Sequence, residues 1–185
     1  MVNKKEPFSF VDEIEWVHRD KNGKVIKRYS SNTRTNRILK MLHLKSKNCM
    51  TNDAFAQVAA WMLHDIDANH SSYANCDWLG IGTGTGAADP TDYKLGTSKS
   101  RLAGVGTRVT TSGITNNTAQ IVVTFSQAND AGLTGIMAIT EVGMFWASTG
   151  DHTMLMRQTF TAENMNWDQG DTFEMTVKVQ NKQGS

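Results

Sequence analysis

Apolar and polar residues alternate along the first part of the chain, as in a strand with one buried face. Within residues 8–18, Ile14, Trp16 and His18 fall on one side, and Asn22-Gly23 separates this run from a second one at 24–29. An Asn-Gly pair between alternating runs is a strong signal for a β-hairpin with a two-residue type I′ turn. Such a turn predicts these pairs: Trp16 with Tyr29, His18 with Lys27, Arg19 with Ile26 and Lys21 with Lys24.

A helical spacing replaces the alternation between the hairpin and residue 66. Residues able to cap a helix stand at 32–33 and at 51–52 and precede two segments with apolar residues three or four positions apart. The second segment, 53–66, carries one apolar stripe, which is typical of a helix that packs on a core. The stripe consists of Phe55, Val58, Ala59, Met62, Leu63 and Ile66. We therefore expect two α-helices here.

From Trp78 onward the pattern is that of short strands separated by turn residues. Alternation is clear in 119–125 and 173–179, and a long loop rich in glycine, threonine and aspartate covers 83–104. No helical segment separates the strands, which favours antiparallel over parallel pairing. The predicted strands are 78–82, 105–111, 118–126, 136–147, 153–161 and 172–180.

These elements predict a mainly β fold. We expect an antiparallel β-sandwich of jelly-roll-like type, with an N-terminal β-hairpin and two α-helices. Residues 1–77 would form an assembly or attachment region, and residues 78–185 the sandwich domain. The chain of 185 residues is long enough for one domain with a substantial core.

The net charge of +1 conceals an asymmetry along the chain. Residues 1–50 hold 12 basic and 5 acidic side chains, whereas residues 51–185 hold 7 basic and 13 acidic ones. A basic N-terminal region can be a solvated face, attract the acidic part of a neighbouring subunit, or touch nucleic acid. We favour the first two over nucleic acid and assign Lys40, Lys45 and Lys47 to a predicted assembly surface.

The sequence offers few signs of membrane, redox or metal chemistry. No apolar run approaches the length of a transmembrane helix, and the basic N-terminus is not followed by a secretory apolar segment. Cys49 and Cys76 are far apart, so we expect two reduced thiols. His64 and His70 lack the spacing of helical metal ligands. We therefore expect no cofactor, no metal and no membrane partner.

A glycine-rich run at 80–86 superficially resembles a phosphate-binding loop. In a dinucleotide site such a loop would open a helix, but Pro90 follows closely and would stop it. The glycines are better explained by a sharp turn of the chain between sheets.

Glu141 is the one charged residue in the apolar run 136–146. Strand alternation places it on the same face as Ile139, where a carboxylate must be exposed or paired. The candidate partners outside the basic N-terminal part are Arg101, Arg108 and Arg157. We expect a structural ion pair rather than a general acid or base, because no second carboxylate stands at a defined spacing.

Several short motifs, taken in order, resemble a β-sandwich family common among the structural proteins of tailed viruses. They cover about residues 78–180, and Met144 stands where the family commonly has leucine. The resemblance implies a tail-fibre, baseplate or other virion-surface component, with no catalytic residues to carry over. The motifs are Leu79–Gly86, Asp89–Asp92 with Leu95-Gly96, Ala119–Phe125, Thr140–Phe145 and Met154–Phe160.

The resemblance predicts a non-enzymatic structural protein, present in many virion copies, that joins other subunits in the tail, fibre or baseplate. Its expected partners are copies of itself and other virion proteins. One alternative is a capsid decoration or turret protein on the head. Another is a carbohydrate- or receptor-binding module that contacts a host surface glycan or receptor through the loop residues Thr83, Asp89, Asp92 and Tyr93.

Overall fold

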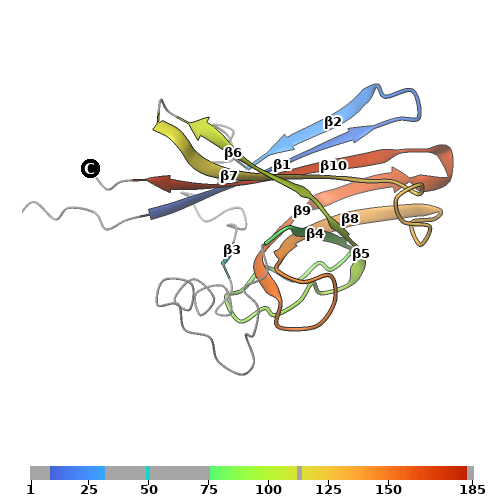
Figure 1. Ribbon diagram of the computed structural model, residues 1–185. Helices are drawn as coiled ribbons and strands as arrows, with labels where there is room; N and C mark the ends of the chain where they lie inside the picture. Colours follow the sequence, from blue (N-terminus) through green and yellow to red (C-terminus); the bar gives the residue numbers. More distant parts are fainter. Residues whose placement is uncertain (1–8, 32–48, 51–75, 112–113, 183–185) are drawn as a thin grey trace, which may run out of the picture.

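The computed structural model describes residues 9–31, 49–50, 76–111 and 114–182. Within these residues the chain forms two antiparallel sheets that pack face to face as a β-sandwich (Figure 1). The predicted helices and the predicted assembly surface of Lys40, Lys45 and Lys47 lie outside the described residues. No helix among the described residues is long and apolar enough to cross a membrane.

Sheet A contains five strands in the order β2-β1-β10-β7-β6. β1 pairs with β10 along its whole length and with β2 on its other side. The hairpin assigned to a separate N-terminal region therefore forms two strands of the sandwich itself. The bounds are β1 (Ser9–Arg19), β2 (Val25–Ser30), β6 (Val105–Thr111), β7 (Ile114–Phe125) and β10 (Thr172–Lys182).

Sheet B also contains five strands, in the order β3-β9-β8-β4-β5. Its first strand has only two residues and extends the sheet beside β9. β5 falls inside the loop that the sequence predicts for 83–104. The bounds are β3 (Cys49–Met50), β4 (Trp78–Gly82), β5 (Ser98–Ala103), β8 (Ile136–Phe145) and β9 (Met154–Asn166).

The hairpin confirms most of its predicted register but not its predicted turn. Trp16 pairs with Tyr29, and their rings stack with centroids 5.5 Å apart. The register shifts after His18, so Arg19 pairs with Val25 rather than Ile26. The cause is a longer turn: Gly23 alone adopts a positive φ of 77°, and the Asp20 carboxylate accepts the N–H groups of residues 22 and 24. This arrangement is typical of a three-residue loop with a bulge, not of type I′.

The jelly-roll detail of the prediction is wrong for the described strands. In a jelly roll, most successive strands alternate between the sheets. Here β4 and β5, β6 and β7, and β8 and β9 are neighbours within one sheet. In each of these pairs the second strand runs antiparallel beside the first, so strands that are consecutive in the sequence are hydrogen-bonded to each other. It crosses between sheets after β5, β7 and β9 (Figure 1), and β2 and β3 also belong to different sheets.

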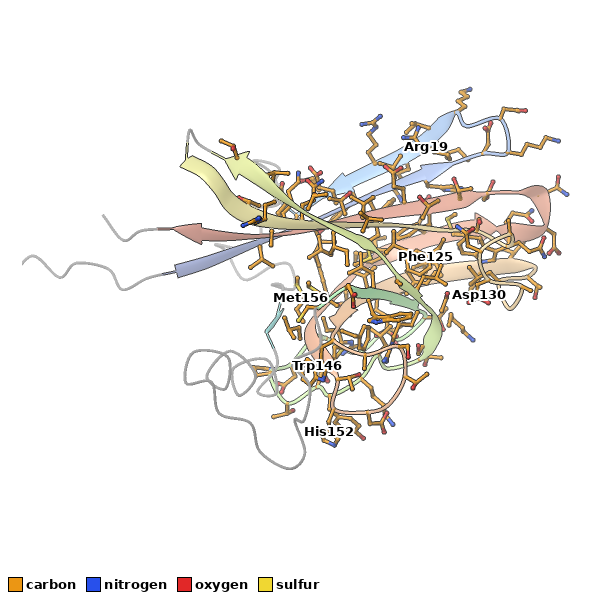
Figure 2. All side chains as sticks on the ribbon, viewed as in Figure 1. Arg19, Phe125, Asp130, Trp146, His152 and Met156 are labelled. Carbon is orange, nitrogen blue, oxygen red and sulfur yellow. The ribbon has the colours of Figure 1, made fainter. Side chains whose placement is uncertain are left out.

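The core lies between the two sheets and consists of rows of inward side chains. In sheet A, Trp16, Met175 and Val123 occupy matching positions on three neighbouring strands. Phe125 of sheet A and Met156 of sheet B, both labelled in Figure 2, belong to the same buried cluster. Burial of these large side chains is the main stabilising contribution to the sandwich.

Candidate functional site

Glu141 is fully buried, yet it does not face the core between the sheets. The pairing of β8 with β9 shifts register between Ile139 and Glu141, which marks a β-bulge. Ile139 joins the cluster between the sheets, whereas Glu141 lies beneath residues 84–97, on the other side of sheet B. The prediction that the two residues share a face is therefore wrong. Ile139 pairs with Glu163 and Glu141 with Thr159, so β9 has residues 160–162 opposite residue 140 alone, and strand alternation breaks at this bulge.

Backbone N–H groups from the loop between β4 and β5 surround the Glu141 carboxylate. Oε1 accepts hydrogen bonds from the N–H of Gly84 at 2.8 Å and of Thr97 at 2.8 Å. Oε2 accepts one from the N–H of Gly96 at 3.0 Å. Both ends of the loop are thus attached to a single side chain, and these bonds offset part of the cost of burying its charge.

Arg157 is the partner of Glu141. Its Nε and Nη2 lie 2.8 Å from Glu141 Oε2, and its Nη1 donates to Asp92 Oδ2 at 2.8 Å. The remaining donors reach the carbonyls of Gly86 and Ala87. Burial acts to lower the pKa of Arg157, but hydrogen bonds and charge attraction to Asp92 and Glu141 outweigh it and raise that pKa. Arg157 remains charged and crosslinks the middle of the loop to the sheet.

Two glycines, Gly82 at the end of β4 and Gly84 in the loop, are required by close approach to this carboxylate. A Cβ added at Gly82 would lie 2.5 Å from Glu141 Oε1 and 2.5 Å from the carbonyl oxygen of Thr97. A Cβ at Gly84 would also lie 2.5 Å from Glu141 Oε1, whereas one at Gly86 would meet nothing. Gly82 and Gly84 therefore pack on the buried charge. The expectation of a sharp turn between sheets is wrong, because Gly80 and Gly82 lie in β4, none of the run's glycines has a positive φ, and the loop that follows leads to β5 of the same sheet.

The two other candidate arginines do not contact Glu141. Arg101 lies over the ring of Phe145, 3.6 Å from its centroid, and donates to the carbonyl of Ala147. Burial lowers its pKa, partly opposed by attraction to Asp151. Arg108 is exposed on β6 and forms no ion pair with another described residue. Sequence alone left the partner open among three arginines, and the fold selects Arg157.

The loop residues proposed as a contact surface mostly hold the loop itself. The Thr83 N–H bonds the carbonyl of Thr97, and Asp92 accepts from both Arg157 and the N–H of Asp89. Asp89 accepts from the hydroxyl and the N–H of Thr91, and these bonds lower its pKa. This part of the loop is therefore braced from within.

Tyr93 is the exposed ring of the loop. It stacks on His152, with centroids 4.6 Å apart, and Lys94 Nζ lies 5.1 Å from the Tyr93 ring centroid. His152 has a positive φ of 57° and donates its N–H to the Tyr93 carbonyl. Figure 2 shows His152 on the side of sheet B away from sheet A.

Sequence reasoning missed a second buried polar cluster, which joins the two sheets. His18 of β1 is 3% exposed, with Nδ1 2.7 Å from Glu163 Oε1 and Nε2 3.0 Å from Asp171 Oδ2. Glu163 lies on β9 of sheet B, and it also accepts a hydrogen bond from Lys27. The sequence did contain a signal for this cluster: in the alternating run 8–18, His18 falls on the same side as Ile14 and Trp16, so a buried histidine in need of polar partners could have been predicted.

A cleft of about 290 Å³ opens where sheet A extends past β8. Apolar side chains of Ile121, Met144 and Val177 line it together with Cys76. Burial, with a smaller contribution from the neighbouring charge of Asp77, raises the pKa of Cys76 to about 12. A neutral thiol is a weak nucleophile. Among the described residues, no group of three or more His, Cys, Asp or Glu side chains has an arrangement that could hold a metal ion.

The Glu141 cluster brings together motifs that are far apart in the sequence. The Gly-rich run, the loop containing Asp92, the strand containing Glu141 and the strand containing Arg157 all meet there. Both carboxylate oxygens are occupied by donors and the side chain has no exposed surface, so it has no position from which to reach a substrate. The chain matches no protein-family model, no curated protein and no solved structure.

Proposed function

We propose that this chain is a non-enzymatic structural protein of a tailed virus particle, present in many copies and joining subunits in the tail, fibre or baseplate region. In this proposal the virion is its location, and its partners are copies of itself and other virion proteins. The β-sandwich supplies a rigid body whose surface loops and strand edges make the contacts.

One observation carries the proposal: four of the five motifs that resemble the tailed-virus family meet around Glu141, and the fifth, Ala119–Phe125, lies on β7 and supplies core residues. Gly84, Asp92, Glu141 and Arg157 come from four separate motifs and form one hydrogen-bonded cluster. The cluster attaches a surface loop to sheet B and leaves no free acceptor at Glu141. Motifs that hold a surface loop in place are what we expect of a structural scaffold, and not of an active site.

Two alternatives remain within the same class of particle. A capsid decoration or turret protein on the head would use the same fold, and only its location separates it from the tail proposal. A receptor- or glycan-binding module would need an aromatic face open to a sugar. Contacts of Tyr93 with His152 and Lys94 occupy its ring, which weakens that alternative.

The test is to locate the chain in purified virus particles. Particles are separated into capsid and tail fractions, and peptides of this chain are quantified by mass spectrometry. The proposal expects many copies per particle, enriched with the tail. Enrichment with capsids would support the decoration or turret alternative instead, and absence from particles would overturn the proposal.

A further inference from the structure

The edge strands of the two sheets differ in how they are protected. An edge strand presents unpaired backbone N–H and C=O groups, and charge, short length or a bulge usually guards it against pairing. In sheet B, β3 has two residues, and β5 carries two basic side chains. In sheet A, β2 also carries two basic side chains, whereas β6 has seven residues and one charge, Arg108.

β6 also exposes the residues that would meet an added strand. Val105 is 72% exposed, and residues 106–108 are exposed as well. A Cβ placed on Gly106 would meet nothing within 4 Å, so the space beside it is open. The same part of β6 lines the cleft that contains Ile121 and Val177.

We propose that β6 is a self-association surface through which two copies of this chain join, by antiparallel pairing of their β6 strands about a two-fold axis at Thr107. This inference rests on the proposed function, which requires many copies. A second copy is the occupant because antiparallel pairing of identical strands satisfies both edges at once and closes at two subunits. The two A sheets become one continuous sheet.

The register follows from charge and size. A two-fold axis at Arg108 would place two guanidinium groups directly opposite each other, which is unfavourable. With the axis at Thr107, Arg108 of each copy faces Gly106 of the other, where space is open and the apolar cleft can receive the arginine stem. Val105 then faces Val109 of the second copy. The register shift of β6 between Val109 and Thr111 limits regular pairing to residues 105–109.

A cysteine at the axis tests this register directly. Thr107→Cys places two thiols opposite each other across the axis, so mild oxidation is expected to give a disulfide-linked dimer. Val105→Cys is the matched control. It lies on the same exposed strand, but the proposed register places it opposite Val109 of the second copy and not opposite the same position of that copy. The parent chain controls for Cys49 and Cys76. Equal dimer yields from the two variants, or none from Thr107→Cys, would overturn the proposed register.

Light scattering during size-exclusion chromatography tests the surface without a covalent link. Pairing of five residues buries less than the roughly 1,600 Å² of a standard interface, so we expect a dimer that dissociates on dilution. Val105→Lys should weaken this dimer at least about tenfold. Ile26→Lys, at a 54% exposed position on the opposite edge, should leave it unchanged. A parent chain that stays monomeric at every concentration, or equal weakening by both variants, would contradict the inference.

The two proposals fail in different ways. A chain found in purified particles that neither dimerises nor crosslinks at Thr107→Cys would overturn the β6 interface and leave the virion role standing. A chain that dimerises through β6 but is absent from particles would overturn the virion role alone.

Discussion

The two buried polar clusters of this sandwich hold different parts of the fold together. The cluster at Glu141 lies on the side of sheet B away from sheet A and fixes one loop, using backbone N–H groups and Arg157. The cluster at His18 lies between the sheets and connects β1, β2 and β9 with Asp171, just before β10, mainly through side chains, with one backbone N–H from Asn166. One cluster therefore stabilises a local shape, and the other stabilises the packing of two sheets.

This difference predicts how much stability each cluster loses when one of its side chains is substituted. The donors to Glu141 are mostly backbone groups and one arginine, so removing Arg157 leaves a carboxylate with no charge partner in a fully buried position. At His18 the contacts are shared among four side chains, and we expect the half-exposed Lys27 still to contact Glu163 after His18 is lost. We therefore expect the loop cluster to be the more sensitive of the two.

The largest expected effect is that of Arg157→Met. It leaves Glu141 and Asp92 without their common partner, and breaking a buried ion pair costs about 3–5 kcal/mol. The free energy of unfolding, measured by urea denaturation, should fall by this amount. Lys94→Met, which removes an exposed ion pair with Asp151, is the control and should change little. A small loss in Arg157→Met would mean that backbone donors suffice for Glu141.

His18→Leu should cost less, about 2 kcal/mol, because it leaves two buried carboxylates each short of one hydrogen bond. The same denaturation experiment measures it. His152→Asn serves as the exposed comparison: asparagine tolerates its positive φ, so the variant loses only surface contacts such as the stack on Tyr93 and should cost less than His18→Leu. A loss as large as that of Arg157→Met would contradict the ranking of the two clusters.

Gly82→Ala sharpens the comparison within the loop cluster. The added Cβ would lie 2.5 Å from Glu141 Oε1 and from the Thr97 carbonyl oxygen, so the loop must shift, at a cost of about 1–3 kcal/mol. Gly86→Ala in the same run meets no neighbour and should not destabilise the fold. Equal melting temperatures for the two variants would show that the loop is not held tightly against Glu141.

The smallest effect at neutral pH is expected for Cys76, a partly buried thiol that carries no charge. Burial raises the pKa of Cys76 from its usual value of 9.0 to about 12. Its thiol ionises first in the unfolded chain, so the folded state should lose stability as pH rises through about 9 towards 12, and this loss should be negligible at neutral pH. Cys76→Ala should flatten the pH dependence of the urea midpoint in that range. An unchanged slope would mean that Cys76 is accessible to water in the folded state.

Much of the sheet content could be predicted because it depends on local patterns. Trp78–Gly82 and Val105–Thr111 have the predicted bounds, and the Trp16–Tyr29 pair follows from the position of the turn. β5 was missed because Ser98–Ala103 contains little apolar alternation. It becomes a strand through its backbone pairing with β4, which no local pattern records.

The sequence by itself determined most strands from Trp78 onward, the Trp16–Tyr29 pairing of the hairpin and the need of Glu141 for a partner. Tertiary structure alone decided that this partner is Arg157, that a bulge turns Glu141 away from the core, and that His18 meets Glu163 and Asp171, 145 and 153 residues away. The physical reason is range. Alternation and turn chemistry act between near neighbours in the chain, whereas a buried charge finds its partner only once strand register and sheet packing are set.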